Sequence, residues 1–271
     1  MLNNIILGRF ILRNSFVHRL DPRIKIVLVV ILLINIFLSV NYLSLFINLV
    51  AIFIFLLMTK ISIKTYINNI KFILFIALFT VILNMFYAKG TPIFVLGPIV
   101  ITDEGFRNSI FVAVRLVMLI LISELLTFTT SPTDLTDALE SLLKPLSLFN
   151  IKTHEIAMMM TIALRFIPTL LEETNKIMDA QKARGANMET GKFLNRIKAF
   201  IPVLIPLFVS SIKRAYDLAL AMESRCYRGG EGRTRMKILH INLCDIFAII
   251  IVLSIFAMVL LSNFFVPVVN L

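Results

Sequence analysis

The sequence predicts an all-α, polytopic membrane protein with about five transmembrane helices and a cytosolic helical domain containing two long helices. Composition supports this fold class: 59% of the 271 residues are hydrophobic and only 16% are charged, whereas soluble domains are about 45–50% apolar and about 25% charged. The mean hydropathy of +0.93 agrees and excludes a disordered chain. Long uncharged stretches also alternate with basic ones, and this alternation defines the elements.

The first two spans are expected within residues 26–59, a run of 34 positions without a charged residue. A helix needs about 20 residues to cross a hydrocarbon core of about 30 Å, so this run is too long for one crossing and short for two. Two helices joined by a tight turn near Asn41 fit if the flanking Arg23, Lys25 and Lys60 extend their charged groups to the membrane interface.

Three further spans complete the predicted membrane part, at residues 72–88, 106–126 and 246–271. Thr102 or Asp103 is expected to cap the second of these helices, because a short polar side chain there can accept from the first backbone N–H groups. Just before it, residues 93–102 are expected to form a small hairpin about Gly97-Pro98.

Charge orients the five spans. Of the 27 Lys and Arg residues, 24 fall in the first 25 residues, in the loop after the second span and in residues 127–240. The positive-inside rule places these segments in the cytosol, so the N-terminus is expected inside and the C-terminus outside. Most of the net charge of +11 is thereby explained by topology, and no nucleic-acid partner is expected.

The spans divide the chain into three parts: transmembrane helices 1–4 in residues 1–126, a cytosolic helical domain in residues 127–240, and the last transmembrane helix in residues 241–271. The middle part opens with Ser131-Pro132 and an acid at Asp134. A serine N-cap, a proline at N1 and an acid at N3 predict the start of a short helix. This helix is expected to stop near Lys144-Pro145.

Two long helices are predicted next, at about residues 153–184 and 192–228. Each is apolar in its first part and charged in its second part. Pro168 lies inside the first helix, and Pro202 and Pro206 lie inside the second. In the second helix, apolar and small residues recur at helical spacing, and this pattern supports the assignment.

The apolar parts of these helices, residues 156–171 and 200–211, could form two further spans. That arrangement would place residues 172–199, with six Lys and Arg, outside the membrane. The two parts are also short for spans, and the first contains Arg165. Helices that pack against the inner membrane face or against other protein are therefore preferred, while embedding in the membrane stays open.

The sequence carries no recognisable catalytic or cofactor motif. Gly191-Lys192 is similar to the end of a phosphate-binding loop, but Ala186 stands where its first glycine should be and Phe193 follows the lysine. No Ser/His/Asp set, acidic cluster or Cys/His group with metal-ligand spacing is visible. The chain is therefore expected to be a non-catalytic subunit that binds no metal or cofactor itself, rather than a membrane enzyme acting on lipids.

Arg115 lies in the middle of the fourth span. A charge inside the membrane is a functional candidate by default, but no transported ion is implied, so a structural partner within the bundle is the favoured interpretation. A self-sufficient secondary transporter or channel remains the alternative function. It would tend to show repeats or polar residues at mid-membrane, and Arg115 alone qualifies.

Both long helices end in a small–Arg–small tripeptide, Ala183-Arg184-Gly185 in the first and Ser224-Arg225-Cys226 in the second. One interpretation is helix capping, because a cation offsets the macrodipole and glycine supplies the left-handed turn. The other is docking, in which the rigid fork of guanidinium donors grips carboxylates or carbonyls of a partner. The chain carries two such helix ends, here called tips, but no nucleotide-binding motif of its own. Both interpretations therefore stay open.

Several stretches together resemble the transmembrane T component of energy-coupling factor (ECF) transporters, the EcfT/CbiQ-like family. In chain order they are residues 14–25, 129–140, 163–168, 181–186 and 221–234. The first contains Asp21-Pro22-Arg23, expected to be a turn and anchor before the first span. Each stretch is weakly specific alone, but together they cover nearly the whole chain in order.

The resemblance implies a scaffold that joins two cytosolic ABC-type ATPases to a substrate-binding membrane subunit, the S component, for vitamin or micronutrient uptake. ATP and Mg²⁺ would be bound by the ATPases and not by this chain. The resemblance assigns Arg184 and Arg225 to docking in grooves of the ATPases. Arg115, Arg165 and three prolines (Pro168, Pro202 and Pro206) are kept as structural or coupling candidates.

One position departs from the family pattern. The usual second Ala-Arg-Gly reads Ser224-Arg225-Cys226 here, and Cys cannot replace Gly in a left-handed cap without strain. The helix is therefore expected to continue through Tyr227 and to cap at Gly229.

Overall fold

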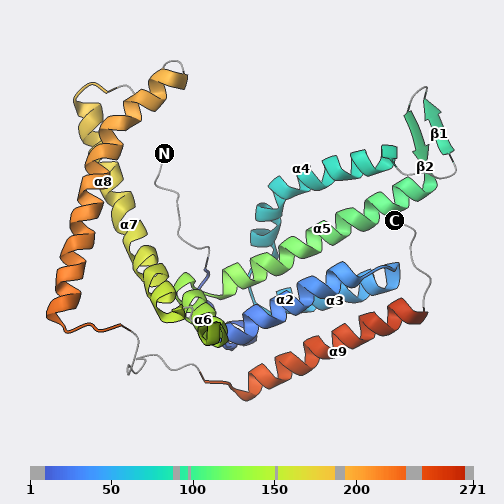
Figure 1. Ribbon diagram of the computed structural model, residues 1–271. Coiled ribbons are helices and arrows are strands. Elements are labelled where there is room, and N and C mark those ends of the chain that lie inside the picture. The colour runs from blue at the N-terminus through green and yellow to red at the C-terminus, as the bar shows by residue number, and fades with distance from the viewer. Residues whose placement is uncertain are drawn as a thin grey trace. The chain divides into compact units, whose positions relative to one another are not determined.

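The computed structural model describes residues 10–87, 92–96, 99–149, 152–186, 193–229 and 240–265. Apart from one two-stranded hairpin, the elements in these ranges are helical (Figure 1), as the sequence predicts. They form two compact units, a bundle unit within Gly8–Ala138 and Ile238–Leu271 and a helix-pair unit within Leu139–Lys237.

The bundle unit contains α1 (Phe16–Arg19), α2 (Pro22–Leu38), α3 (Tyr42–Met58), α4 (Ile63–Tyr87), β1 (Pro92–Leu96), β2 (Ile99–Thr102), α5 (Asp103–Thr129) and α9 (Leu243–Phe265). The helix-pair unit contains α7 (Thr153–Ala183) and α8 (Phe193–Ser224). Between α5 and α7 run α6 (Pro132–Leu143) and a short 3-10 helix (Lys144–Phe149), and the division between the units falls within α6.

The predicted tight turn near Asn41 is confirmed. α2 begins at Pro22, and the Asp21 side chain accepts from the backbone N–H of Arg23 at 2.9 Å, an N-cap followed by proline at N1. α3 begins after Asn41, whose backbone N–H donates to Ser44 Oγ at 3.1 Å. Each helix has 17 residues, which is about 26 Å at 1.5 Å per residue.

The remaining bundle elements follow the sequence closely. The hairpin pairs β1 with β2 in antiparallel register, and Thr102 caps α5 by accepting from the backbone N–H of Gly105 at 3.1 Å. α4 begins earlier than residue 72 and bends by 56° between Ile63–Lys71 and Leu74–Asn84.

Within the described residues, four helices are long and apolar enough to cross a membrane, namely α5, α7, the Ala199–Ser224 part of α8, and α9. The bent α4 is a fifth if its two halves act as one span. Together these helices make the chain a multi-pass membrane protein. Length and apolarity admit α7 and α8 as spans, so their position at the inner membrane face stays a prediction.

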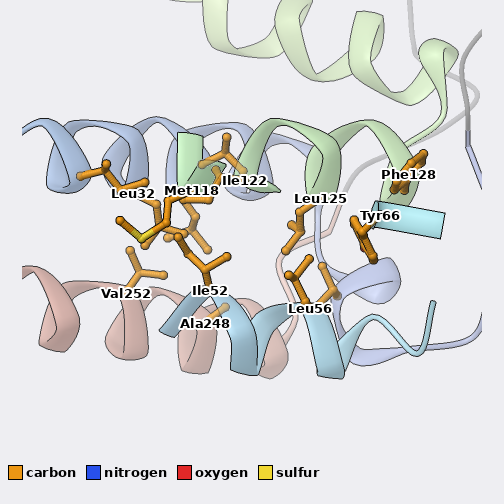
Figure 2. Packing of buried hydrophobic residues seen from close by; sticks show 14 of the residues in the cluster. Leu32, Ile52, Leu56, Tyr66, Met118, Ile122, Leu125, Phe128, Ala248 and Val252 are labelled. Carbon is orange, nitrogen blue, oxygen red and sulfur yellow. The ribbon is translucent and has the colours of Figure 1, made fainter. Parts of the chain in front are cut away.

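The core of the bundle unit lies where α2, α3, α5 and α9 meet. In Figure 2, Leu32, Ile52, Met118 and Val252 converge from these four helices. A buried hydrogen bond of 2.9 Å from Asn35 Nδ2 to the Asn48 side chain joins α2 to α3. Inside a membrane, close packing and such interhelical hydrogen bonds hold helices together, because lipid and core are equally apolar.

A buried polar cluster joins the starts of α2 and α9 to the end of α5. Lys25 is buried, and its Nζ donates to the backbone oxygen of Thr129 at 2.9 Å. The expectation that Lys25 extends to the interface is therefore wrong, because its ammonium group is buried and donates to backbone carbonyl oxygens within the bundle unit. Asp245 is also fully buried and accepts from the backbone N–H of Asp21 at 2.8 Å.

Candidate functional site

The second unit is built on the pairing of α7 with α8. Glu173 of α7 accepts from Arg214 Nη2 of α8 at 2.6 Å and from the hydroxyl of Ser210. One face of α8 is covered in this pair. Its side chains Val203, Leu207 and Leu218 are buried or half-buried, whereas their neighbours along the helix are exposed. The sequence did not reveal the Glu173 contacts, because charge spacing alone does not fix the register of two paired helices.

Contacts along the pair run in antiparallel order. Gln181, near the end of α7, donates to the backbone oxygen of Pro202 at 3.4 Å, near the start of α8. At the other extreme, the Tyr227 hydroxyl, just after α8, donates to Met158 Sδ at 2.9 Å, near the start of α7. The C-terminal ends of α7 and α8 therefore lie at opposite ends of the pair, as Figure 1 shows. α7 alone has 31 residues, or about 46 Å.

The end of α7 is a Schellman cap. Arg184 occupies the C-cap position, and Gly185 follows in the left-handed region with φ of 86°. The backbone N–H of Gly185 donates to Lys182 at 2.9 Å, and that of Ala186 donates to Gln181 at 3.0 Å. These two bonds satisfy carbonyl oxygens that would otherwise lack a partner at the helix end.

The end of α8 has the same hydrogen-bond pattern. The backbone N–H of Cys226 donates to Glu223 at 2.8 Å, and that of Tyr227 donates to Met222 at 3.0 Å. Cys226 takes the left-handed position with φ of 56°. The expected continuation of the helix to Gly229 is therefore wrong: α8 ends at Ser224. The two capping bonds and the Tyr227 contact offset the strain of about 1–2 kcal/mol that a non-glycine residue carries there.

Both arginines at these helix ends are exposed to solvent. Arg184 and Arg225 are exposed, and so are their flanking residues in both tripeptides. Among the described residues, neither guanidinium has a side-chain hydrogen bond or ion pair. Backbone N–H groups already satisfy the last carbonyls, so the arginine side chains are not needed for capping bonds and remain available to a partner.

The other candidates lie elsewhere in the fold. Arg165 and the three prolines are exposed along α7 and α8. Of these, Pro202 lies close to the Arg184 tip, because its backbone oxygen accepts from Gln181, three residues before Arg184. Arg115 belongs to the bundle unit, where Nη2 donates to the backbone oxygen of Ser39 and the guanidinium lies 4.7 Å from the ring centroid of Phe111. These contacts give Arg115 partners within the bundle, and its structural or coupling role stays a prediction.

An apolar surface occupies the first part of α8. The exposed fractions of its large side chains reach 60% at Ile205 and 68% at Phe208. The surface, here called the α8 apolar face, comprises Ile201, Leu204, Ile205, Phe208, Val209 and Ile212. Contiguous exposed apolar surface of this kind indicates contact with protein or membrane.

Comparison with known proteins agrees with this architecture. The sequence model of one family, CbiQ, described as "Cobalt transport protein", matches residues 13–238. Proteins described as "Energy-coupling factor transporter transmembrane protein EcfT" are similar over nearly their whole length. The one from Ruminiclostridium cellulolyticum is 49% identical over 246 residues, which is 91% of this chain and 92% of the relative. The one from Clostridium kluyveri is 44% identical over 265 residues, 97% and 98% of the two chains. The chain thus belongs to the CbiQ family and is a transmembrane T component of the energy-coupling factor transporter type.

Proposed function

We propose that this chain couples two cytosolic ABC-type ATPases to a membrane-embedded S component that binds a vitamin or another micronutrient. The observation that carries the proposal is the pair of exposed arginines, Arg184 and Arg225, on equally capped helix ends at opposite ends of one helix pair. Each tip docks in a groove of one ATPase. The ATPases bind ATP and Mg²⁺ and perform the hydrolysis, while this chain transmits the movement.

The small residues beside each arginine support docking. Ala183 and Gly185 flank the first arginine, and Ser224 and Cys226 flank the second. Their short side chains allow a partner backbone to approach the helix end closely. The guanidinium then reaches carboxylate or carbonyl oxygens in the groove, where its five donors form directional hydrogen bonds.

The tips bind the ATPases, and the α8 apolar face is the surface that passes their movement on. In this proposal it contacts the S component or the inner membrane face. Approach and separation of the ATPases move the two tips and change the crossing angle of α7 and α8, which shifts the α8 apolar face. The crossing angle is the two-state element that coupling between distant sites requires.

Substitution of the two arginines tests the proposal. Arg184→Ala and Arg225→Ala are each expected to weaken co-purification of the ATPases with the tagged chain, and the double variant is expected to abolish it together with uptake of the cognate substrate. Lys213→Ala is the matched control, because Lys213 is an exposed cation on α8 away from both tips. Normal co-purification and normal uptake in the double variant would refute the docking role.

A further inference from the structure

An apolar groove opens between α3, α4 and α5 in the bundle unit. Its volume is about 440 Å³, and aliphatic and aromatic side chains line it, among them Leu49, Ile52, Ala77, Val114 and Met118. A groove of this kind on a membrane bundle faces acyl chains and not water. Its occupant is therefore an apolar segment, either a lipid tail or part of another membrane protein.

The two halves of the bent α4 contribute differently to this groove. All of its α4 residues, from Leu74 to Val81, come from the second half. The first half is fixed to the bundle by Tyr66, which is buried. The Tyr66 hydroxyl lies 3.2 Å from Thr59 Oγ1, and its ring packs edge-on against Phe128 at 5.2 Å between centroids.

Three lysines stand in the chain segment between α3 and the second half of α4, the half that lines the groove. Lys60, Lys64 and Lys71 are exposed, and the chain has no Asp or Glu between residues 59 and 87. Lys64 and Lys71 are seven residues apart and so lie on one face of the helix, away from buried Tyr66. Lys71 precedes the first groove residue of α4, Leu74, by three positions, so the two are neighbours across the bend.

We propose that the groove binds an acyl chain of an anionic phospholipid whose phosphate is held by Lys60, Lys64 and Lys71. Basic sites beside apolar grooves between membrane helices are typical of anionic headgroup binding. An uncharged groove and three exposed lysines in the preceding segment match the two parts of such a lipid, and Glu124 of α5 is the acidic residue whose charge acts on Tyr66 in that segment. A hydrophobic helix of a partner would fill the groove but would bring no phosphate to the three lysines.

The lysines can be tested by native mass spectrometry of the purified full chain in neutral detergent. Phosphatidylglycerol and phosphatidylcholine are titrated separately into each sample. The natural chain is expected to retain phosphatidylglycerol preferentially, and Lys60→Gln, Lys64→Gln and Lys71→Gln together are expected to weaken its binding by about a hundredfold. The control combines Lys152→Gln, Lys176→Gln and Lys213→Gln, which remove three exposed cations from the other unit and should leave binding unchanged.

A second variant tests the groove itself. Leu78→Trp adds bulk at a half-exposed lining position and is expected to reduce retention of phosphatidylglycerol while the lysines stay intact. Circular dichroism and thermal melting check that each variant is folded. Equal retention of the two lipids by the natural chain, or an unchanged preference in the triple lysine variant, would overturn the proposal. Displacement of phosphatidylglycerol only by a co-purified membrane protein would assign the groove to that partner instead.

Discussion

At the scale of single residues, Cys226 is the most informative position. It holds a left-handed backbone conformation that glycine holds at the equivalent position of the other tip. Cys226→Gly is expected to stabilise the chain by about 1 kcal/mol because it removes the steric cost of the Cβ atom. Thermal melting in detergent measures this as a higher midpoint. Cys226→Val should lower the midpoint, and an unchanged midpoint in both variants would contradict the assigned strain.

Asp245 supports a second prediction at this scale. Its carboxylate accepts from the backbone N–H groups of Asp21 at 2.8 Å and of Asn242 at 2.7 Å. Asp245→Ala leaves a buried donor without a partner, at a cost of about 1–3 kcal/mol, and should lower the melting midpoint clearly. Asp217→Ala is the control, because Asp217 is exposed on α8. Equal melting of the two variants would show that the buried cluster contributes little.

At the scale of elements, the contact of Glu173 with Arg214 fixes the register of α7 against α8. Both side chains are partly exposed, so solvent screens their attraction and the ion pair contributes little to the free energy of unfolding. Glu173→Ala is therefore expected to leave the fold and ATPase co-purification intact while reducing uptake for each ATP hydrolysed. The ratio of uptake to hydrolysis in reconstituted vesicles measures this loss of coupling. Lys213→Ala, which removes an exposed cation of α8, should keep the ratio unchanged.

The sequence predicted the elements well where local signals are strong. Uncharged runs located the bundle helices, Ser131 capped α6 by accepting from the backbone N–H of Asp134 at 3.1 Å, and Thr102 capped α5. Two predictions failed: the ammonium group of Lys25 is buried against the backbone oxygen of Thr129, and local capping bonds to Glu223 and Met222 accompany a left-handed turn at Cys226. The first has no signature in the local sequence, because Thr129 is distant along the chain. The second goes against the local sequence, because a non-glycine residue disfavours the left-handed turn that the helix end adopts.

At the scale of the whole molecule, the predicted orientation places both tips in the cytosol. Exposed Cys226 then reacts with a membrane-impermeant maleimide only after the cells are opened, which gel-shift labelling measures in a Cys244→Ser background. Gly97→Cys, in the loop expected outside, is the opposite control and should react in intact cells. Labelling of Cys226 in intact cells would show that this tip lies outside the cell. Cytosolic ATPases would then be excluded as its partners.

The antiparallel order of α7 and α8 also bears on symmetry. Two helices that run in opposite directions and end in matching caps are related by an approximate twofold axis perpendicular to the pair. Two equivalent partner subunits are commonly arranged about a twofold axis as well. Under the proposed function, one chain therefore offers a symmetric pair of ATPases two nearly equivalent sites, and the difference between Gly185 and Cys226 marks where that equivalence is incomplete.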